Sequence, residues 1–508
     1  MSSASTTQQN VRLNFDLLEE PFLMFAGNYA AKDAKVGLRE AGPAGLDSPL
    51  HPAEVVISVV GTHQTSELAQ TWINQCADVV PGKKDKPRQL PDFPGFNETS
   101  PFQSRIRALQ APQGIITQSE ISNVVTQQKY EVGFRSAVDL LTEKVELTCE
   151  SLPGTLVVLC AIPQAIVEYC AEAGSYLVRA GSQTKDRLFA RLLRLEQETG
   201  QMHFLESLAP GNVGTDDFVY KNLRRALKAR TMKTQRPIQL ALESRLFSAA
   251  SQHPAQKAWN FCVAQYYKST GALPWRLEGM DPGTCFVGIS FFRGIAEDSI
   301  NVHTSLAQVF SGDGEAFVVR GHRFHWDQKR SPHLPRDGAE KLMRLIIERY
   351  KEFRGGLPPR RIVLHKTSKF WEDEFEGFCA GLGGIREYDF VSMQQTGVRF
   401  FREGGYPPLR RMHAQLGNAH FLYTMGYIPE LGTYPKGYVP EPFQLLDHRG
   451  DATPRRLFRE VLALTKMNFN NSDFADGDPI TIRFARRIGE ILAYIGDAEE
   501  NRHYRFYM

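Results

Sequence analysis

The chain has 508 residues, of which 42 % are hydrophobic and 23 % are charged, a composition typical of an ordinary globular protein. The length predicts two or three domains with sizeable buried cores. Because the formal net charge is only +3, bulk charge does not attract nucleic acid, and any such affinity must come from local basic patches.

Seven cysteines are scattered along the chain with no CxxC spacing, and most of them stand in apolar runs. This usage predicts reduced core thiols in a cytoplasmic protein rather than disulfides or a zinc site. The sequence carries no N-terminal signal and no apolar run long enough to span a bilayer, so we expect no membrane association. Residues 1–14, which begin MSSASTTQQN, are predicted to form a disordered tail.

The first half of the sequence alternates between buried strands and helices. Residues 53–61 and 154–163 are continuous apolar runs of the kind found in buried parallel strands, and residues 236–244 give another short strand. This order predicts a doubly wound, Rossmann-like α/β domain over residues 15–275. The helices expected between and after these strands are residues 65–80, 136–152 and 255–271.

The pattern starts again after the Gly- and Pro-rich stretch 273–284. Three strands lead, the first of them in TCFVGISFFRG (284–294), and a helix follows at 338–353. Three strands, a helix and then further strand–helix units is the order of the RNase H fold, which we predict for residues 276–508. The remaining elements predicted are strands at 360–367 and 387–395, an edge hairpin at 419–430, and helices near 372–381, 455–468 and 479–495.

One segment, YKNLRRALKARTMKTQRP (220–237), has seven lysines and arginines and no acid. Arg224 and Lys228 stand four residues apart and share one helix face. Gln239 follows on the next strand, and Lys268 lies on the helix after that. Two amines, a guanidinium and an amide brought together suit a terminal phosphate, which accepts several charge-assisted hydrogen bonds at once. A solvated basic helix face is the alternative interpretation, because basic runs are common on surfaces.

Several long stretches, in order, resemble the MID and PIWI halves of prokaryotic Argonautes. EEPFLMFAGNYAAKDAKVGLREAGP (19–43) resembles the signature that precedes the MID domain of that family. LKARTMKTQRPIQ (227–239) and WNFCVAQYYKSTGALPW (259–275) resemble the guide-binding segment and its join to PIWI. ALTKMNFNNSDF (463–474) resembles a stretch near the PIWI C-terminus. The length leaves no room for the N-terminal and PAZ domains of long Argonautes, so the resemblance is to a short Argonaute.

The resemblance implies a pocket for the 5′-phosphate of a guide strand. Carried over motif by motif, the residues that hold the phosphate are Arg224, Lys228, Gln239 and Lys268. The family often places a divalent ion there, which implies a structural Mg²⁺ held partly by the carboxylate of Met508. The chain ends in RHYRFYM, an apolar and aromatic terminus that suits an inward-turned end.

The residues at the family's nuclease positions differ from its metal-binding tetrad. An active PIWI domain clamps two Mg²⁺ ions with carboxylates. Here the first aspartate corresponds to Ser290, the third to Thr367 and the fourth residue to Arg486, while Asp337 or Glu340 aligns with the glutamate. Hydroxyl groups ligate Mg²⁺ poorly and a guanidinium repels it. We therefore expect no catalytic residue and no slicing by this chain.

The function that the resemblance implies is that of a guide-loaded sensor. A small guide RNA recognises complementary single-stranded DNA, and an associated APAZ-domain effector then acts as a TIR or sirtuin-like NADase or as a nuclease. The biological output is abortive infection, an antiviral and anti-plasmid defence. Two alternatives stay open: a nuclease with a relocated metal site, for which Glu297 and Asp298 are the nearest carboxylates, and a binder that blocks its target without an effector.

Overall fold

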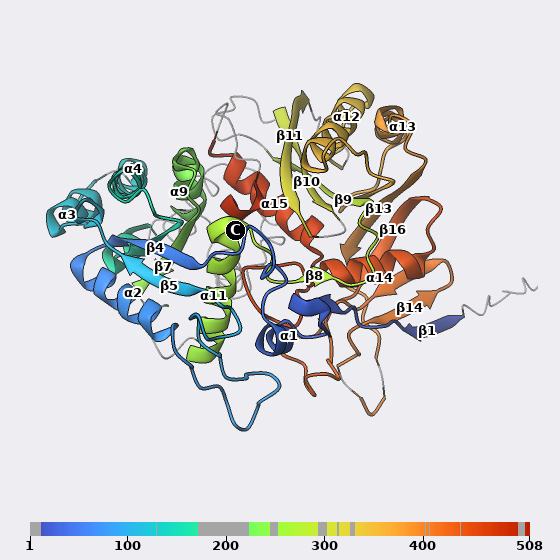
Figure 1. The fold of residues 1–508 in the computed structure, drawn as a ribbon. Coiled ribbons are helices and arrows are strands. Elements are labelled where there is room, and N and C mark those ends of the chain that lie inside the picture. Colours follow the sequence, from blue (N-terminus) through green and yellow to red (C-terminus); the bar gives the residue numbers. More distant parts are fainter. Residues whose placement is uncertain are drawn as a thin grey trace, which may run out of the picture.

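The computed structural model describes residues 12–128, 130–170, 223–243, 252–292, 302–311, 314–325, 331–401, 403–405, 407–436, 438–495 and 503–508. The described residues form two lobes, which meet near α11 (Pro254–Thr270), α15 (Ile480–Leu492) and the C-terminus (Figure 1). No helix in these ranges is long and apolar enough to cross a membrane. All seven cysteines are free thiols.

The first lobe is built on a four-stranded parallel sheet of order β5-β4-β6-β7. β4 and β6 are buried almost throughout, as their continuous apolar runs predict, because helices cover both faces of the sheet. α2 and α11 pack on one face and α3, α4 and α9 on the other. The doubly wound α/β prediction is therefore confirmed. The bounds are β4 Glu54–Gly61, β5 Arg105–Leu109, β6 Val157–Ile162, β7 Ile238–Leu242, α2 His63–Gln75, α3 Gln118–Val125, α4 Tyr130–Ser151 and α9 Leu223–Thr231.

The second lobe is built on a nine-stranded mixed sheet of order β1-β14-β15-β16-β13-β12-β9-β10-β11. β9 and β12 are parallel, as are β12 and β13, and the other pairs are antiparallel. α15 covers one face of β9, and α12 and α13 cover the other. The bounds are β1 Leu13–Leu17, β9 Thr284–Phe292, β10 Val302–Ser311, β11 Ala316–His325, β12 Arg361–Lys366, β13 Glu387–Gln395, β14 Met412–Leu416, β15 Ala419–Leu422, β16 Phe443–Gly450, α12 Arg336–Phe353, α13 Glu372–Gly381 and α14 Pro454–Leu464.

The N-terminal segment joins the second lobe. β1 pairs with β14, although residues from 15 onwards were assigned to the first domain and residues 1–14 to a tail. Of that tail, residues 1–11 lie outside the described residues. Farther along, β2 (Leu23–Met24) pairs with β3 (Ala30–Ala31) and with β8 (Arg276–Leu277) in a small sheet. The lead-in thus connects the large sheet with the segment between the lobes, followed by α1 (Ala34–Ala41).

A buried ion network fixes this lead-in. Glu20 is 1 % exposed at its side chain and pairs with Arg410 and Lys466 at 3.0 and 2.9 Å. Burial alone raises the pKa of Glu20, but the charges of Arg410 and Lys466 outweigh it and hold that pKa below its ordinary value. Lys466 belongs to the stretch 463–474, so two segments from opposite ends of the chain meet here.

The predicted edge hairpin at 419–430 is wrong in its position. Its strand, β15, lies inside the sheet between β14 and β16, and the edge strands of the described sheet are β1 and β11. The prediction failed because β15 forms its hairpin with the preceding strand, β14, and its other side is taken by β16 from farther along the chain.

Candidate functional site

Two lysines enter the region between the lobes from helices of the first lobe. Lys228 of α9 and Lys268 of α11 are 2 % and 1 % exposed. The Lys268 ammonium donates to Gln239 Oε1 at 2.5 Å and to the Ile238 carbonyl at 3.4 Å. Lys228 lies close enough to Lys268 for the Lys268 charge to lower its pKa. The structure therefore brings together Lys228, Gln239 and Lys268 from three separate elements.

The Lys228 amine has no hydrogen-bond partner among the described residues. A buried amine left without a partner costs free energy, because it has given up its bonds to water and received none in return. Its neighbours are cations rather than acids: Lys268, Arg224 and Arg487 all lower its pKa after burial itself, the largest cause. An unpaired buried donor ringed by positive charge is suited to an anion.

The pKa values of the two site lysines reflect the positive charge around them. Burial, followed by the charge of Arg224, lowers the pKa of Lys268 to about 7. Burial and the surrounding cations hold the pKa of Lys228 well below its ordinary value. Arg224 itself is solvent-exposed on α9. Without an anion, both amines therefore hold their protons less tightly than a solvent-exposed lysine does.

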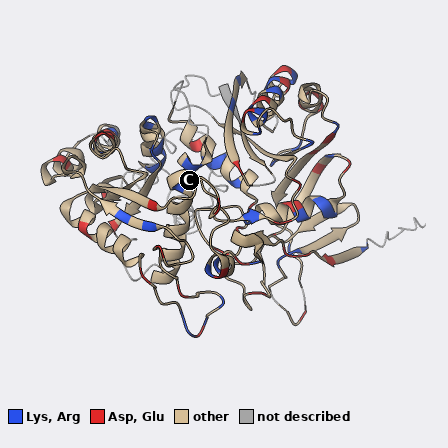
Figure 2. Ribbon diagram, viewed as in Figure 1, with Lys and Arg blue, Asp and Glu red and all other residues tan. Residues whose placement is uncertain are grey.

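Arg487 of α15 is a site residue that the sequence analysis missed. Burial, then Arg483 and Arg224, lowers its pKa to about 10, so it belongs to the same cationic cluster. Its helix comes from the second lobe and is joined to α9 by the ion pair between Arg225 and Glu490 at 2.5 Å. Figure 2 shows lysines and arginines gathering on α9 and α15 where the lobes meet. The neighbouring Arg486 was singled out because it matches a nuclease position, and no local signal marked Arg487.

The C-terminal residues turn inward at the same junction. Met508 is fully buried, and the Tyr504 ring packs 5.9 Å from that of Tyr267 on α11 and 4.8 Å from that of Phe484 on α15. Arg505 donates to the Ser269 carbonyl at 3.0 Å. The chain end therefore lies between the helices that carry Lys268 and Arg487, as Figure 1 also shows.

The donor set here is better suited to a phosphate than to a metal ion. No group of three or more His, Cys, Asp or Glu side chains suited to a metal occurs among the described residues. The Gln239 side-chain oxygen already accepts from Lys268, and the nearby charges are positive. A divalent cation would add repulsion to this cluster, whereas a phosphate relieves it. The Mg²⁺ ion with Met508 as ligand stays a prediction.

Ser290, Thr367 and Arg486, the residues that the resemblance aligns with nuclease positions, lie near one another. β9 and β12 run parallel with His365 beside Gly288, which puts Thr367 next to Ser290 at the carboxyl ends of the two strands. The Ser290 hydroxyl donates to the Ala485 carbonyl at 2.7 Å, immediately before Arg486 on α15. The Ser290 hydroxyl therefore serves to dock the helix.

The candidate glutamate positions lie elsewhere. Asp337 and Glu340 are on α12, which covers the opposite face of β9 from α15. Asp337 pairs with Lys341 at 3.5 Å and Glu340 with Arg344 at 2.7 Å, both on the helix surface. The structure does not bring either carboxylate to Ser290. Glu297 and Asp298 lie outside the described residues.

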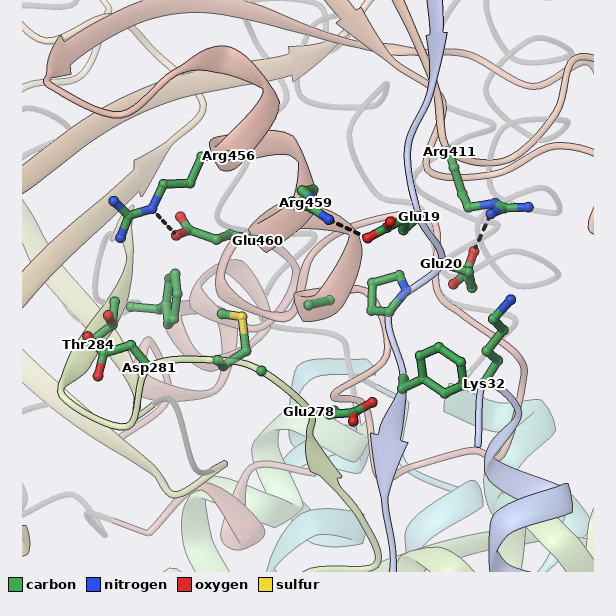
Figure 3. Close-up of a pocket in the computed structure, with 16 residues that line it drawn as sticks. Glu19, Glu20, Lys32, Glu278, Asp281, Thr284, Arg411, Arg456, Arg459 and Glu460 are labelled. Carbon is green, nitrogen blue, oxygen red and sulfur yellow. Dashed lines mark hydrogen bonds and ion pairs between the residues drawn. The ribbon is translucent and has the colours of Figure 1, made fainter. Parts of the chain in front are cut away.

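A cleft of about 700 Å³ lies between the lead-in, the segment 278–284 and α14 (Figure 3). Its cations point toward carboxylates rather than into free space: Arg456 pairs with Glu460, Arg459 with Glu19, Arg411 with Glu20, and Lys32 with Glu430. Since these charges already satisfy one another, the cleft offers a phosphate much less than the unpaired Lys228 does.

No protein-family model matches the sequence, and no curated protein matches it. Solved structures do match. Clostridium butyricum Argonaute bound to a guide DNA and a 19-mer target DNA superimposes with a TM-score of 0.56 at 14 % identity, over 97 % of this chain and 55 % of that one. The chain has an Argonaute-type fold. This agrees with the large mixed sheet and the parallel sheet described above.

Two further Argonaute structures show the same likeness. Aa-Ago with externally bound siRNA gives a TM-score of 0.51 at 13 % identity, over 97 % of this chain and 56 % of that one. A. aeolicus Argonaute gives 0.50 at 14 % identity, over 96 % and 54 %. The chain spans about half the length of these Argonautes. Identities this low establish the fold and nothing finer.

Proposed function

We propose that this chain is a guide-loaded nucleic-acid sensor whose phosphate pocket is formed by Arg224, Lys228, Gln239 and Lys268. The unpartnered, buried Lys228 amine carries the proposal. A guide's terminal phosphate would accept hydrogen bonds from Lys228 and Lys268 and anchor the strand end between the lobes. Base pairing along the rest of the guide then reads sequence, while the protein reads backbone charge and shape.

The finer parts of the proposal follow the resemblance. They are a small RNA guide, a single-stranded DNA target, and a short Argonaute that works with an APAZ-bearing NADase or nuclease in cytoplasmic defence. The matches in residues 19–43, 227–239, 259–275 and 463–474 support them. Solved proteins of this fold carry guide DNA with target DNA, or siRNA. Mg²⁺ at the guide end, with the Met508 carboxylate as ligand, is proposed for the guide-loaded state alone, in which the phosphate offsets the surrounding cations.

Bound nucleic acid tests the pocket directly. The chain, purified together with any co-encoded neighbour, is expected to yield short nucleic acids that accept a 5′ label only after phosphatase treatment. Lys228→Ala combined with Lys268→Ala is expected to lose them, because two charge-assisted hydrogen bonds to phosphate amount to about 3–6 kcal/mol. Arg230→Ala is the matched control, since Arg230 lies on the same helix but is exposed and paired with Asp139. Guides that persist in the double variant would refute the assignment of the pocket.

We also propose that the second lobe holds a duplex without cutting it. With guide and complementary target in Mg²⁺ or Mn²⁺, the purified chain is expected to give no product above background. Ser290, Thr367 and Arg486 supply no anionic oxygen to a two-metal site. Product formation that disappears on Glu297→Gln or Asp298→Asn, but not on Glu348→Gln, would show instead a nuclease with a relocated metal site.

A further inference from the structure

Two buried amines share the pocket without an acid to neutralise them. The Lys228 amine has no described partner, and the Lys268 amine has two neutral ones, the Gln239 side-chain oxygen and the Ile238 carbonyl. The titratable and charged groups that face them from the packed elements are Arg224 of α9, Arg487 of α15, the Cys160 thiol of β6 and Arg505 of η4 (Tyr504–Phe506), which donates to the Lys268 carbonyl.

The carboxylates nearest to this cluster pair with other arginines. Glu490 pairs with Arg225 at 2.5 Å and Asp476 with Arg483 at 2.6 Å. The Cys160 thiol gives no negative charge, because burial raises its pKa to about 12. The side chains that act on the two amines are therefore cations, apart from the neutral Cys160 thiol.

A buried ammonium group needs a counter-charge, because burial removes the water that would otherwise stabilise it. Loss of a proton is the other way to meet this requirement, and the pKa of Lys268, lowered to about 7, shifts in that direction. A phosphate dianion beside both amines raises their pKa values, because it stabilises their protonated forms.

We propose that capture of a 5′-phosphate is coupled to proton uptake by Lys228 and Lys268, so that the two amines add their positive charge to that of the neighbouring arginines when the phosphate enters. Each nitrogen lone pair takes one proton from solvent and becomes the N–H bond donated to phosphate. This inference rests on the proposed function and adds its regulation. A pocket of this kind discriminates against 5′-hydroxyl ends, because a hydroxyl group carries no negative charge that would stabilise the protonated lysines.

The direction of the pH effect follows from linkage. Both lysines have lowered pKa values in the free protein, and the phosphate raises them. Between the free and the bound pKa, binding takes up protons, so the association constant falls as pH rises, by about tenfold per pH unit for each proton. For Lys268 this window opens near pH 7. The phosphate is already a dianion there, because its second pKa is about 6.

Calorimetric titration counts the protons. The full chain is titrated at about pH 8, chosen from the phosphate pKa, in EDTA and in two buffers with different ionisation enthalpies. The probes are one oligonucleotide with a 5′-phosphate and the same oligonucleotide with a 5′-hydroxyl. We expect an uptake of about one to two protons for the phosphorylated probe and none for the hydroxyl probe. Lys268→Arg, which keeps the charge but does not titrate, is expected to remove about one proton of this uptake.

The outcomes separate the two proposals. Tight, phosphate-specific binding with no proton uptake would overturn the proton coupling and leave the pocket intact. Equal binding of the two probes would overturn the pocket and the coupling with it. The wild-type chain alone, titrated from about pH 7 to 9, gives the same information through the slope of affinity against pH, so the inference does not depend on a variant that folds.

Discussion

Lys228→Met is expected to raise the free energy of unfolding by about 1–3 kcal/mol, because it removes a buried polar group that has no partner. The same change is expected to weaken binding of a 5′-phosphorylated guide by about 10- to 100-fold, the equivalent of one hydrogen bond to a charged group. Methionine keeps the unbranched stem of lysine and fits irregular core space. A gain in stability with a loss of affinity is what a binding residue that the fold does not need should show.

Chemical denaturation and guide titration on the same preparations measure both effects. Lys233→Met is the control, because Lys233 lies just beyond α9 with its side chain 68 % exposed and paired only with Glu146 at the surface. It should leave both quantities nearly unchanged. A Lys228→Met chain that is less stable than wild type would show that the amine is a structural group, and would remove the main support for the phosphate pocket.

The periodicity of the sequence predicted the individual elements better than their partners. β4 and β6 appear as continuous apolar runs because both faces of their sheet are covered, and α12 and α15 have one apolar face each. The pairing of β1 with β14 could not be predicted, since it joins distant segments. α1 was not predicted either, because it has only eight residues, one of them glycine.

The residues of the candidate site were likewise predicted where they belong to one lobe and missed where they come from the other. Lys228, Gln239 and Lys268 were found because they follow a motif within one lobe, and the structure places them together. Arg487 was missed because only the packing of α15 against α9 brings it there. A local sequence pattern indicates which residues of one lobe lie together, whereas a site formed by two lobes depends on how the lobes pack against each other.

The position of α15 is set by its packing on β9 at Gly288. A Cβ added to Gly288 would stand 1.8 Å from the Thr481 carbonyl oxygen, which is backbone and cannot turn aside. Gly288→Ala is therefore expected to push α15 outward and to lower the free energy of unfolding by about 1–3 kcal/mol. Because α15 carries Arg487, affinity for a 5′-phosphorylated guide should fall with it. Denaturation and guide titration measure the two losses.

The comparison with Gly338→Ala isolates this close approach from the general effect of replacing a glycine. Gly338 lies in the first turn of α12, where an added Cβ would meet side-chain carbons at 3.5 Å, an ordinary contact. Alanine there should be neutral or stabilise the helix by up to about 1 kcal/mol. If Gly288→Ala lowered stability but left guide affinity intact, α15 would serve the fold alone, and Arg487 would have no part in holding the guide end. A loss of both would support a role for α15, docked on β9 at Ser290 and Gly288, in shaping the phosphate pocket.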